Sequence, residues 1–146
     1  MIKSLFASWQ LWAVLSAMFA ALTAIFAKIG VENVNSDFAT FMRTIVVIVA
    51  LAGILTLLGE WQAPGEITRR TYLFLVLSGL GTGASWLCYF HAMKLGDAAR
   101  VAPIDKLSVV LVAIFGVAVL GERLNPANWL GVALIAGGAI LVAYRF

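Results

Sequence analysis

The stretch Arg100–Arg123, RVAPIDKLSVVLVAIFGVAVLGER, decides how the rest of the chain is interpreted. Its apolar body, Leu107–Leu120, is long enough for most of a bilayer crossing. Near its start, an acid and a base stand side by side as Asp105 and Lys106, just after Pro103. Because charges close to hydrocarbon are costly, an ionisable pair in a membrane segment is a candidate functional site.

The composition of the whole chain is that of a membrane protein. Its 146 residues are 63% hydrophobic and 12% charged, whereas a soluble domain is roughly half apolar and a quarter charged. The net charge is +3, but the basic residues are scattered at segment ends and form no patch, which excludes nucleic-acid binding. Cys88 is the single cysteine of the sequence, so neither a disulfide framework nor a cysteine metal site is expected within one chain.

Apolar runs of about 20 residues recur along the chain and are separated by short loops rich in turn formers and charges. We therefore predict an all-α membrane protein with five transmembrane helices, forming one domain over residues 1–146. The predicted spans are Trp9–Ile29, Asp37–Leu58, Thr71–Met93, Ala99–Leu120 and Pro126–Tyr144.

Several helix ends can be predicted from capping residues. Ser36 or Asp37 is expected to cap the second span, and Asn125 is expected to cap the fifth. Gly59 and Gly121 follow the second and fourth spans and are expected to end them.

The third span carries two stripes. Gly79 and Gly83 form a GxxxG motif, which predicts close packing against another helix. A weakly polar stripe follows at spacings of four, three and four residues: Ser78, Thr82, Ser85 and Tyr89. Trp86 lies inside the span, where it serves either packing or the wall of a cavity.

The orientation of the spans is not fixed by the balance of basic residues, which is four against four. Lys3, Arg69, Arg70 and Arg123 fall on one side, and Lys28, Lys94, Arg100 and Arg145 on the other. Either other features of the chain decide the orientation, or copies insert both ways. Because five crossings put the two ends on opposite sides, two oppositely inserted copies would form an inverted pair.

Asp105 and Lys106 are the first candidate site. On a continuous helix, adjacent side chains point about 100° apart, so we expect each of the two to find its partner elsewhere. Asp105 and Ser108 would share one helix face. The functional interpretation is a cation or proton site at Asp105, with Lys106 as counter-charge or anion contact. The alternative is a wet, structural first turn at the interface.

Arg43 is the second candidate, about two turns inside the second span. It could bind an anionic substrate group, pair with Asp105, or snorkel to the interface as an anchor. His91 is interpreted as a proton relay or as an interfacial hydrogen-bonding group. No set of residues for catalysis is present in the sequence, so we predict no enzyme activity, no cofactor and no metal.

The chain resembles one EamA-type repeat of the drug/metabolite transporter superfamily along nearly its whole length. The residues that carry the resemblance are Phe26–Gly30, Arg43-Thr44, Gly79–Tyr89, His91–Gly96, Val101–Ser108, Leu120–Leu124, Trp129–Gly131 and Gly137-Gly138. The resemblance implies the five-span bacterial/archaeal transporter branch, and therefore a small-molecule exporter that acts as an antiparallel homodimer in a cytoplasmic membrane. Four-span small multidrug resistance relatives carry a glutamate in the first helix, which this chain lacks, leaving Asp105 as the acid at membrane depth.

We therefore expect a secondary transporter of small metabolites or amphiphilic compounds, whose cavity lies between two copies and is lined by the third and fourth spans with the first. The fifth span is expected to serve packing or dimer contact. The predicted substrate-binding residues are Asp105, Lys106, Arg43, Trp86, Tyr89 and Ser108. The alternative is a non-transporting accessory membrane subunit that packs against a larger partner.

Overall fold

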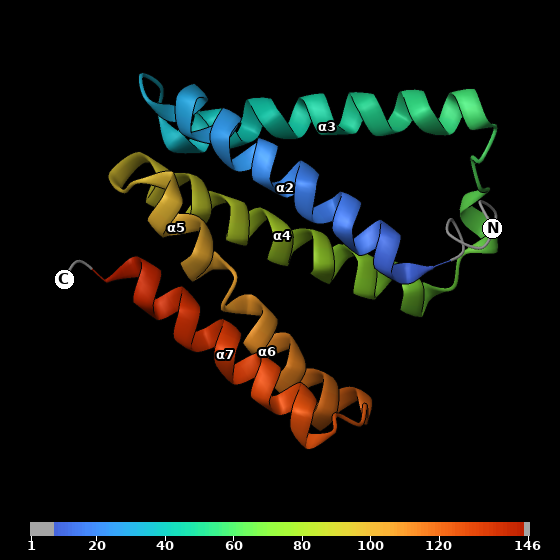
Figure 1. Ribbon diagram of the computed structural model, residues 1–146. Coiled ribbons are helices and arrows are strands. Elements are labelled where there is room, and N and C mark those ends of the chain that lie inside the picture. Colours follow the sequence, from blue (N-terminus) through green and yellow to red (C-terminus); the bar gives the residue numbers. More distant parts are fainter. Residues whose placement is uncertain (1–7, 145–146) are drawn as a thin grey trace. The chain divides into compact units, whose positions relative to one another are not determined.

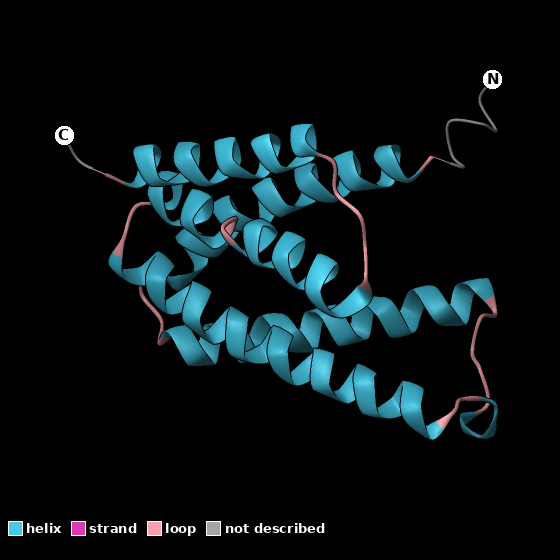
Figure 2. Cartoon of the chain, turned by 90° about the horizontal axis from the view of Figure 1, so that it is seen from below, coloured by secondary structure: helices cyan, strands magenta, loops and turns pink. Residues whose placement is uncertain are grey.

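The computed structural model describes residues 8–144, and in that part of the chain the regular elements are all helical (Figures 1 and 2). In chain order they are α2 (Trp9–Val31), α3 (Ser36–Leu58), η1 (Pro64–Glu66), α4 (Arg69–Leu95), α5 (Ala98–Asp105), α6 (Ser108–Phe115), η2 (Gly116–Leu120) and α7 (Pro126–Ala143). Lys3 and Arg145, which entered the charge balance, lie outside the described residues.

The predicted fold class is confirmed. Within residues 8–144, five helical stretches are long and apolar enough to cross a bilayer, with mean hydropathies from 1.5 to 2.4. Four of them are single helices that match the predicted spans to within two residues at every end. The fourth, Ala98–Leu120, is divided into α5, α6 and η2. The chain is thus a multi-pass membrane protein.

The helix ends follow capping chemistry, with one correction. The side chain of Asn35, and not that of Ser36 or Asp37, caps α3, since its Oδ1 accepts hydrogen bonds from the N–H groups of Asp37 (2.9 Å) and Phe38 (3.1 Å). The predicted cap was wrong by one residue because Ser36 already belongs to the first helical turn. Asn125 caps α7 as predicted, accepting from the N–H of Asn128 at 2.8 Å.

Gly59 and Gly121 end the second and fourth spans as predicted. Both adopt the left-handed conformation, with φ of 67° and 71°, which residues with a side chain rarely take. Within residues 8–144, only these two glycines have positive φ, so the conformational freedom of glycine is used at the two helix ends where the sequence placed it.

The helices group into two compact units. One contains residues 8–26 together with residues 95–144. In it, α7 packs along α5 and α6 (Figures 1 and 2). The Arg100 guanidinium joins the start of α5 to the end of α7 by donating from Nε to the backbone oxygen of Ala143 at 3.1 Å.

The second unit, Ala27–Lys94, contains the last turn of α2 with α3 and α4. Its core lies at one end, where α2 passes into α3. The residues buried there are Ala27, Val31, Ser36, Thr40, Phe90 and Met93. The opposite end, where η1 connects α3 to α4, has no buried residue among Leu57–Tyr72, so the unit is packed firmly at one membrane face only.

The predicted GxxxG contact stays a prediction, since no partner helix lies against its glycines within their own unit. A Cβ placed on Gly79 or on Gly83 would meet no heavy atom within 4 Å, and the same holds for Gly137 of α7. Within its own unit, each of these glycines is therefore without a close neighbour.

Candidate functional site

The fourth span is broken at its ionic residues. α5 ends at Asp105 and α6 begins at Ser108. At the break, the backbone hydrogen bonds shorten to the three-residue type: the N–H of Leu107 donates to Ile104 O, and that of Val109 donates to Lys106 O, both at 3.0 Å. Pro103 lacks an N–H and removes a further helical hydrogen bond just before the break. The prediction of one continuous fourth helix was wrong.

Asp105 and Lys106 form an ion pair with each other, with Lys106 Nζ 3.2 Å from Asp105 Oδ2. The expectation that each needs a partner elsewhere was wrong because it assumed continuous helical geometry, whereas the turn lets the long lysine side chain fold back onto its neighbour. Both side chains stay accessible, Lys106 at 55% and Asp105 at 33%. The pair thus brings two opposite charges together without burying either side chain within the described chain.

Ser108 is the exposed first residue of α6. Asp105 and Ser108 belong to different helices, so their expected shared face stays a prediction. At the break, Ser108 places a hydroxyl at the start of α6, two residues after Lys106 and three residues after Asp105.

The Arg43 guanidinium stacks on an aromatic face of α4. Its Cζ atom lies 4.1 Å from the centroid of the Trp86 ring and 5.6 Å from that of Phe90. Such a cation–π contact contributes from about 0.5 to about 2 kcal/mol. A cationic side chain at the centre of a membrane helix costs about 2.5–3.5 kcal/mol on insertion scales. The aromatic rings therefore offset only part of the cost of this charge.

Tyr89 belongs to the same cluster. Its ring packs edge-on against Phe90, with centroids 6.4 Å apart and planes at 64°. We call Trp86, Tyr89 and Phe90 the aromatic face of α4. The sequence analysis assigned Trp86 and Tyr89 to the site and missed Phe90, although its spacing of four residues from Trp86 was a usable signal.

The four residues of the predicted polar stripe of α4 do not share one set of contacts. Ser78, Thr82 and Ser85 are exposed, and the Thr82 hydroxyl donates to the Ser78 backbone oxygen at 2.9 Å. That hydroxyl is therefore satisfied within its own helix. Tyr89, the last member of the stripe, packs with the aromatic face instead.

Polar contacts join the elements at the packed end of the second unit. Ser36 Oγ and His91 Nδ1 lie 3.4 Å apart, in agreement with the interfacial hydrogen-bonding alternative for His91. Lys28 Nζ donates to Met93 O at 2.8 Å, and Lys94 Nζ donates to Val34 O at 2.7 Å. The sequence analysis used both lysines only for orientation and missed these contacts with backbone carbonyls.

The predicted site residues thus fall into two local groups, each described within its own unit. Asp105, Lys106 and Ser108 surround the break of the fourth span. Arg43 joins Trp86, and Tyr89 reaches the same cluster through Phe90. Among the described residues, no group of three or more His, Cys, Asp or Glu side chains is placed to hold a metal ion.

Comparison with known proteins supports a transporter family. The model of the EamA-like transporter family matches residues 7–144. An uncharacterised transporter encoded in the cobO 3' region of Sinorhizobium sp. is 68% identical over 136 residues, which cover 93% of this chain and 96% of that protein. The uncharacterised transporter YxxF of Bacillus subtilis is 23% identical over 145 residues, covering 99% of this chain but 45% of its own length.

A third relative is named as part of an assembly. The probable 4-amino-4-deoxy-L-arabinose-phosphoundecaprenol flippase subunit ArnE of Pseudomonas fluorescens is 33% identical over 86 residues, covering 58% of this chain and 73% of that protein. No solved structure matches the chain. Membership of a transporter family agrees with the prediction that the chain is not an enzyme. On the family match over residues 7–144 and the 68% identity to a relative of nearly the same length, the chain belongs to the EamA-like transporter family.

Proposed function

We propose that this chain is a secondary transporter that exports small metabolites or amphiphilic compounds across a bacterial cytoplasmic membrane as an antiparallel homodimer. The observation that carries the proposal is the break of the fourth span at Asp105 and Lys106. Broken helices at membrane depth are tolerated where protein or water, and not lipid, covers the freed backbone groups. In transporters, substrate and ion sites are typically formed by such discontinuous helices.

The depth of the break supports a site on the transport path. Asp105 is the eighth residue of α5, and Arg43 is the eighth residue of α3. At 1.5 Å per helical residue, each lies about 10 Å from the start of its span. Both spans begin on the same side of the membrane because two crossings separate their starts. The two charged groups therefore belong to the same membrane leaflet by register.

Each site residue has a role that follows from its chemistry. Asp105 is the ionisable group that exchanges a proton or cation, and Lys106 and Arg43 supply positive charge. The Ser108 hydroxyl adds a hydrogen-bonding group at the start of α6. Trp86 and Tyr89 form the apolar and hydrogen-bonding wall.

Two observations support a second, inverted copy. The basic residues are balanced between the two sides, so neither orientation is strongly favoured. Within their own units, Gly79, Gly83 and Gly137 have no close neighbour, which leaves room for another helix. A substrate path enclosed by two copies also needs no large cavity within one chain.

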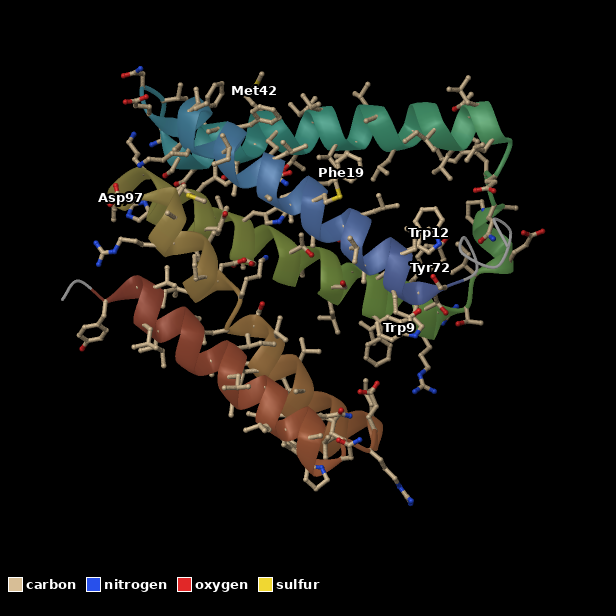
Figure 3. The ribbon with its side chains drawn as sticks, viewed as in Figure 1. Trp9, Trp12, Phe19, Met42, Tyr72 and Asp97 are labelled. Carbon is tan, nitrogen blue, oxygen red and sulfur yellow. The ribbon has the colours of Figure 1, made fainter. Side chains whose placement is uncertain are left out.

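The transport role is tested with the Asp105→Asn variant in proteoliposomes. A ligand-induced thermal-shift screen on the purified protein supplies the test compound, since binding to the folded state stabilises it. We expect Asp105→Asn to reduce exchange of that compound at least about tenfold, which corresponds to about 1.4 kcal/mol. Asp97→Asn is the matched control, because Asp97 is an exposed carboxylate in the turn between α4 and α5 (Figure 3). Unchanged exchange by Asp105→Asn would remove Asp105 from the mechanism.

The antiparallel arrangement is tested by labelling single cysteines in intact cells. In a Cys88→Ala background, Gln62→Cys and Asn33→Cys place thiols in loops on opposite sides of the membrane. Dual insertion predicts that an impermeant maleimide labels a comparable fraction of both variants. Labelling of one variant alone would mean a single orientation and would exclude the antiparallel homodimer.

A single orientation would instead favour the second candidate, an accessory membrane subunit. The specific observation for it is the name of the ArnE relative, which is a flippase subunit. On that alternative, the vacant glycine faces would contact a larger partner and not a second copy.

A further inference from the structure

The Arg43 cluster points to the charge of the substrate. We propose that Arg43, stacked on the aromatic face of α4, binds the phosphate or carboxylate of an anionic substrate that also has an apolar part. This inference rests on the transporter function proposed above and names the chemical class of its substrate.

The first argument is that the guanidinium has no anionic partner in its own unit. Residues 27–94, all described, contain four carboxylates: Glu32, Asp37, Glu60 and Glu66. None of them forms an ion pair with Arg43. The side chains that contact the charge are aromatic rings, which take the face of the guanidinium. The counter-charge has to come from elsewhere, and a bound anion supplies it.

The second argument is the geometry of stacking. A guanidinium is planar and directs its five N–H donors outward within that plane. With Trp86 4.1 Å from Cζ on one face, these donors remain open, and within residues 27–94 none of them makes a hydrogen bond. A stacked arginine is thus held ready for two parallel hydrogen bonds to a carboxylate or phosphate.

The third argument concerns what surrounds the open donors. The hydroxyls of Thr40 and Thr44, one turn apart on α3, donate to the backbone oxygens of Ser36 (2.9 Å) and Thr40 (2.8 Å). Because both hydroxyls already donate within their own helix, Arg43 supplies the hydrogen-bond donors for the anionic group of a ligand. The half-buried rings of Trp86 and Tyr89 offer an apolar surface beside it, whereas Phe90 is buried beneath them in the core of the unit. A ligand that matches both features carries an anionic group on an apolar or aromatic body.

The test uses two phosphate monoesters and one cation as probes. Phenyl phosphate is water-soluble, decyl phosphate is membrane-borne, and phenyltrimethylammonium carries the opposite charge. Binding is measured by titration calorimetry with the full chain in nanodiscs of zwitterionic lipid, with empty nanodiscs subtracted. We expect at least one phosphate to bind and the ammonium not to bind. Phenyl phosphate binding assigns an aqueous source, and binding of decyl phosphate alone assigns a source within the membrane.

The variants assign the binding to Arg43. Arg43→Gln should weaken phosphate binding at least about tenfold, since it removes a charge-assisted bidentate contact. Arg70→Gln is the matched control, because Arg70 also lies over an aromatic ring, that of Phe74 at 5.8 Å, but at the start of α4. It should bind as the parent does. If Arg43→Gln fails to fold, Arg43→Lys keeps the charge and should bind about three to ten times more weakly, because an ammonium cannot form the planar fork.

Trp86 provides a direct readout at the site. Replacing the other four tryptophans by phenylalanine leaves Trp86 as the reporter: Trp9, Trp12, Trp61 and Trp129. Phosphate bound at Arg43 should shift the Trp86 emission in this variant and not after Arg43→Gln. Failure of both phosphates to bind, or parental affinity in Arg43→Gln or Arg43→Lys, would overturn the inference. Since the assay needs neither transport nor an inverted copy, its failure is distinct from failure of the proposed function.

Discussion

The chain carries charge into the membrane in two different ways. At the junction of α5 and α6, the helix breaks, and Asp105 and Lys106 pair across a tight turn. In α3 and α4, the helices stay continuous, and Arg43 lies against aromatic rings without a counter-ion in its unit. The first arrangement neutralises its charges internally, whereas the second leaves a net positive charge. On the two proposals made above, this difference suits the two groups to different tasks: ion exchange at the break and anion recognition at the rings.

The largest expected effect is that of breaking the ion pair from one side. Asp105→Asn leaves the Lys106 ammonium at membrane depth without its carboxylate, and we expect it to destabilise the protein by about 2 kcal/mol, less than for a fully buried pair because both groups are partly exposed. Thermal unfolding in nanodiscs measures this. The double variant Asp105→Asn/Lys106→Gln should recover at least half of the loss, whereas additive losses would mean that the pair is not coupled.

Removing the Arg43 side chain should change the free energy of unfolding in the opposite direction, towards higher stability. Arg43→Leu gives up a cation–π contact of about 0.5–2 kcal/mol but also removes a membrane cost of about 2.5–3.5 kcal/mol. We therefore expect a gain of about 1 kcal/mol in the free energy of unfolding, together with lost anion binding. The same unfolding experiment measures it. A loss of stability as large as that of Asp105→Asn would show that Arg43 is held by an unrecognised counter-charge.

A variant at Pro103 tests what causes the break between α5 and α6. Pro103→Ala restores an N–H that would bond to the Ala99 oxygen, five residues before Ser108. If the proline sets the break, regular helical hydrogen bonds should then extend past Asp105, and the amides of residues 106–109 should exchange more slowly with deuterium. We expect about tenfold slower exchange, or about 1.4 kcal/mol per amide. Unchanged exchange at these positions would mean that the Asp105–Lys106 pair sets the break by itself.

The Asn35 cap tests what stabilises the start of α3, one of the two continuous helices that hold the Arg43 cluster. Asn35→Ala removes the two hydrogen bonds that fix the start of α3, at a cost of about 1 kcal/mol. Asn35→Asp, which keeps the acceptor, is the control and should be close to neutral. Equal losses for both variants would contradict the capping role.

The smallest effect is expected at the end of the fourth span. A Cβ on Gly116 would lie 2.6 Å from Glu122 Oε2, the far end of a flexible side chain that can move away. Although Gly116 is buried, this freedom of the carboxylate to move should keep the cost of Gly116→Ala below about 0.5 kcal/mol. Gly121→Ala, at φ of 71°, should cost more, about 1 kcal/mol, because its strain lies in the backbone. The reverse order of the two variants would contradict this assignment.

The membrane class and the spans could be predicted because apolar length alone determines them. The glycine stops at Gly59 and Gly121 followed from backbone freedom, which is local as well. The break at Asp105 could not be predicted from periodicity, since an ionisable pair just before an apolar run is equally compatible with a continuous helix. Pro103 was noticed, but its effect was not carried forward to the pairing of Lys106 with its neighbour.

The residues of the candidate site could be predicted from their types, but the contacts between them could not. Arg43 and Trp86 were both selected, on separate grounds, but their stacking depends on how α3 and α4 pack, which no local pattern encodes. Phe90 was missed because it looks like any other buried ring. The contacts of Lys28 and Lys94 were missed because their partners are backbone oxygens. Every residue has such an oxygen, so the sequence does not show which one accepts the hydrogen bond.

The most direct test of the central claim is the access of water to the break of the fourth span. In a Cys88→Ala background, Ser108→Cys is read with an impermeant methanethiosulfonate reagent in membrane vesicles, against Val112→Cys one turn further along α6. The account predicts that the thiol at position 108 reacts within about tenfold of a thiol at the loop position Gln62, and that the thiol at position 112 does not react. A thiol at position 108 as inert as that at position 112 would mean that lipid covers the break, and would contradict a transport path at Asp105.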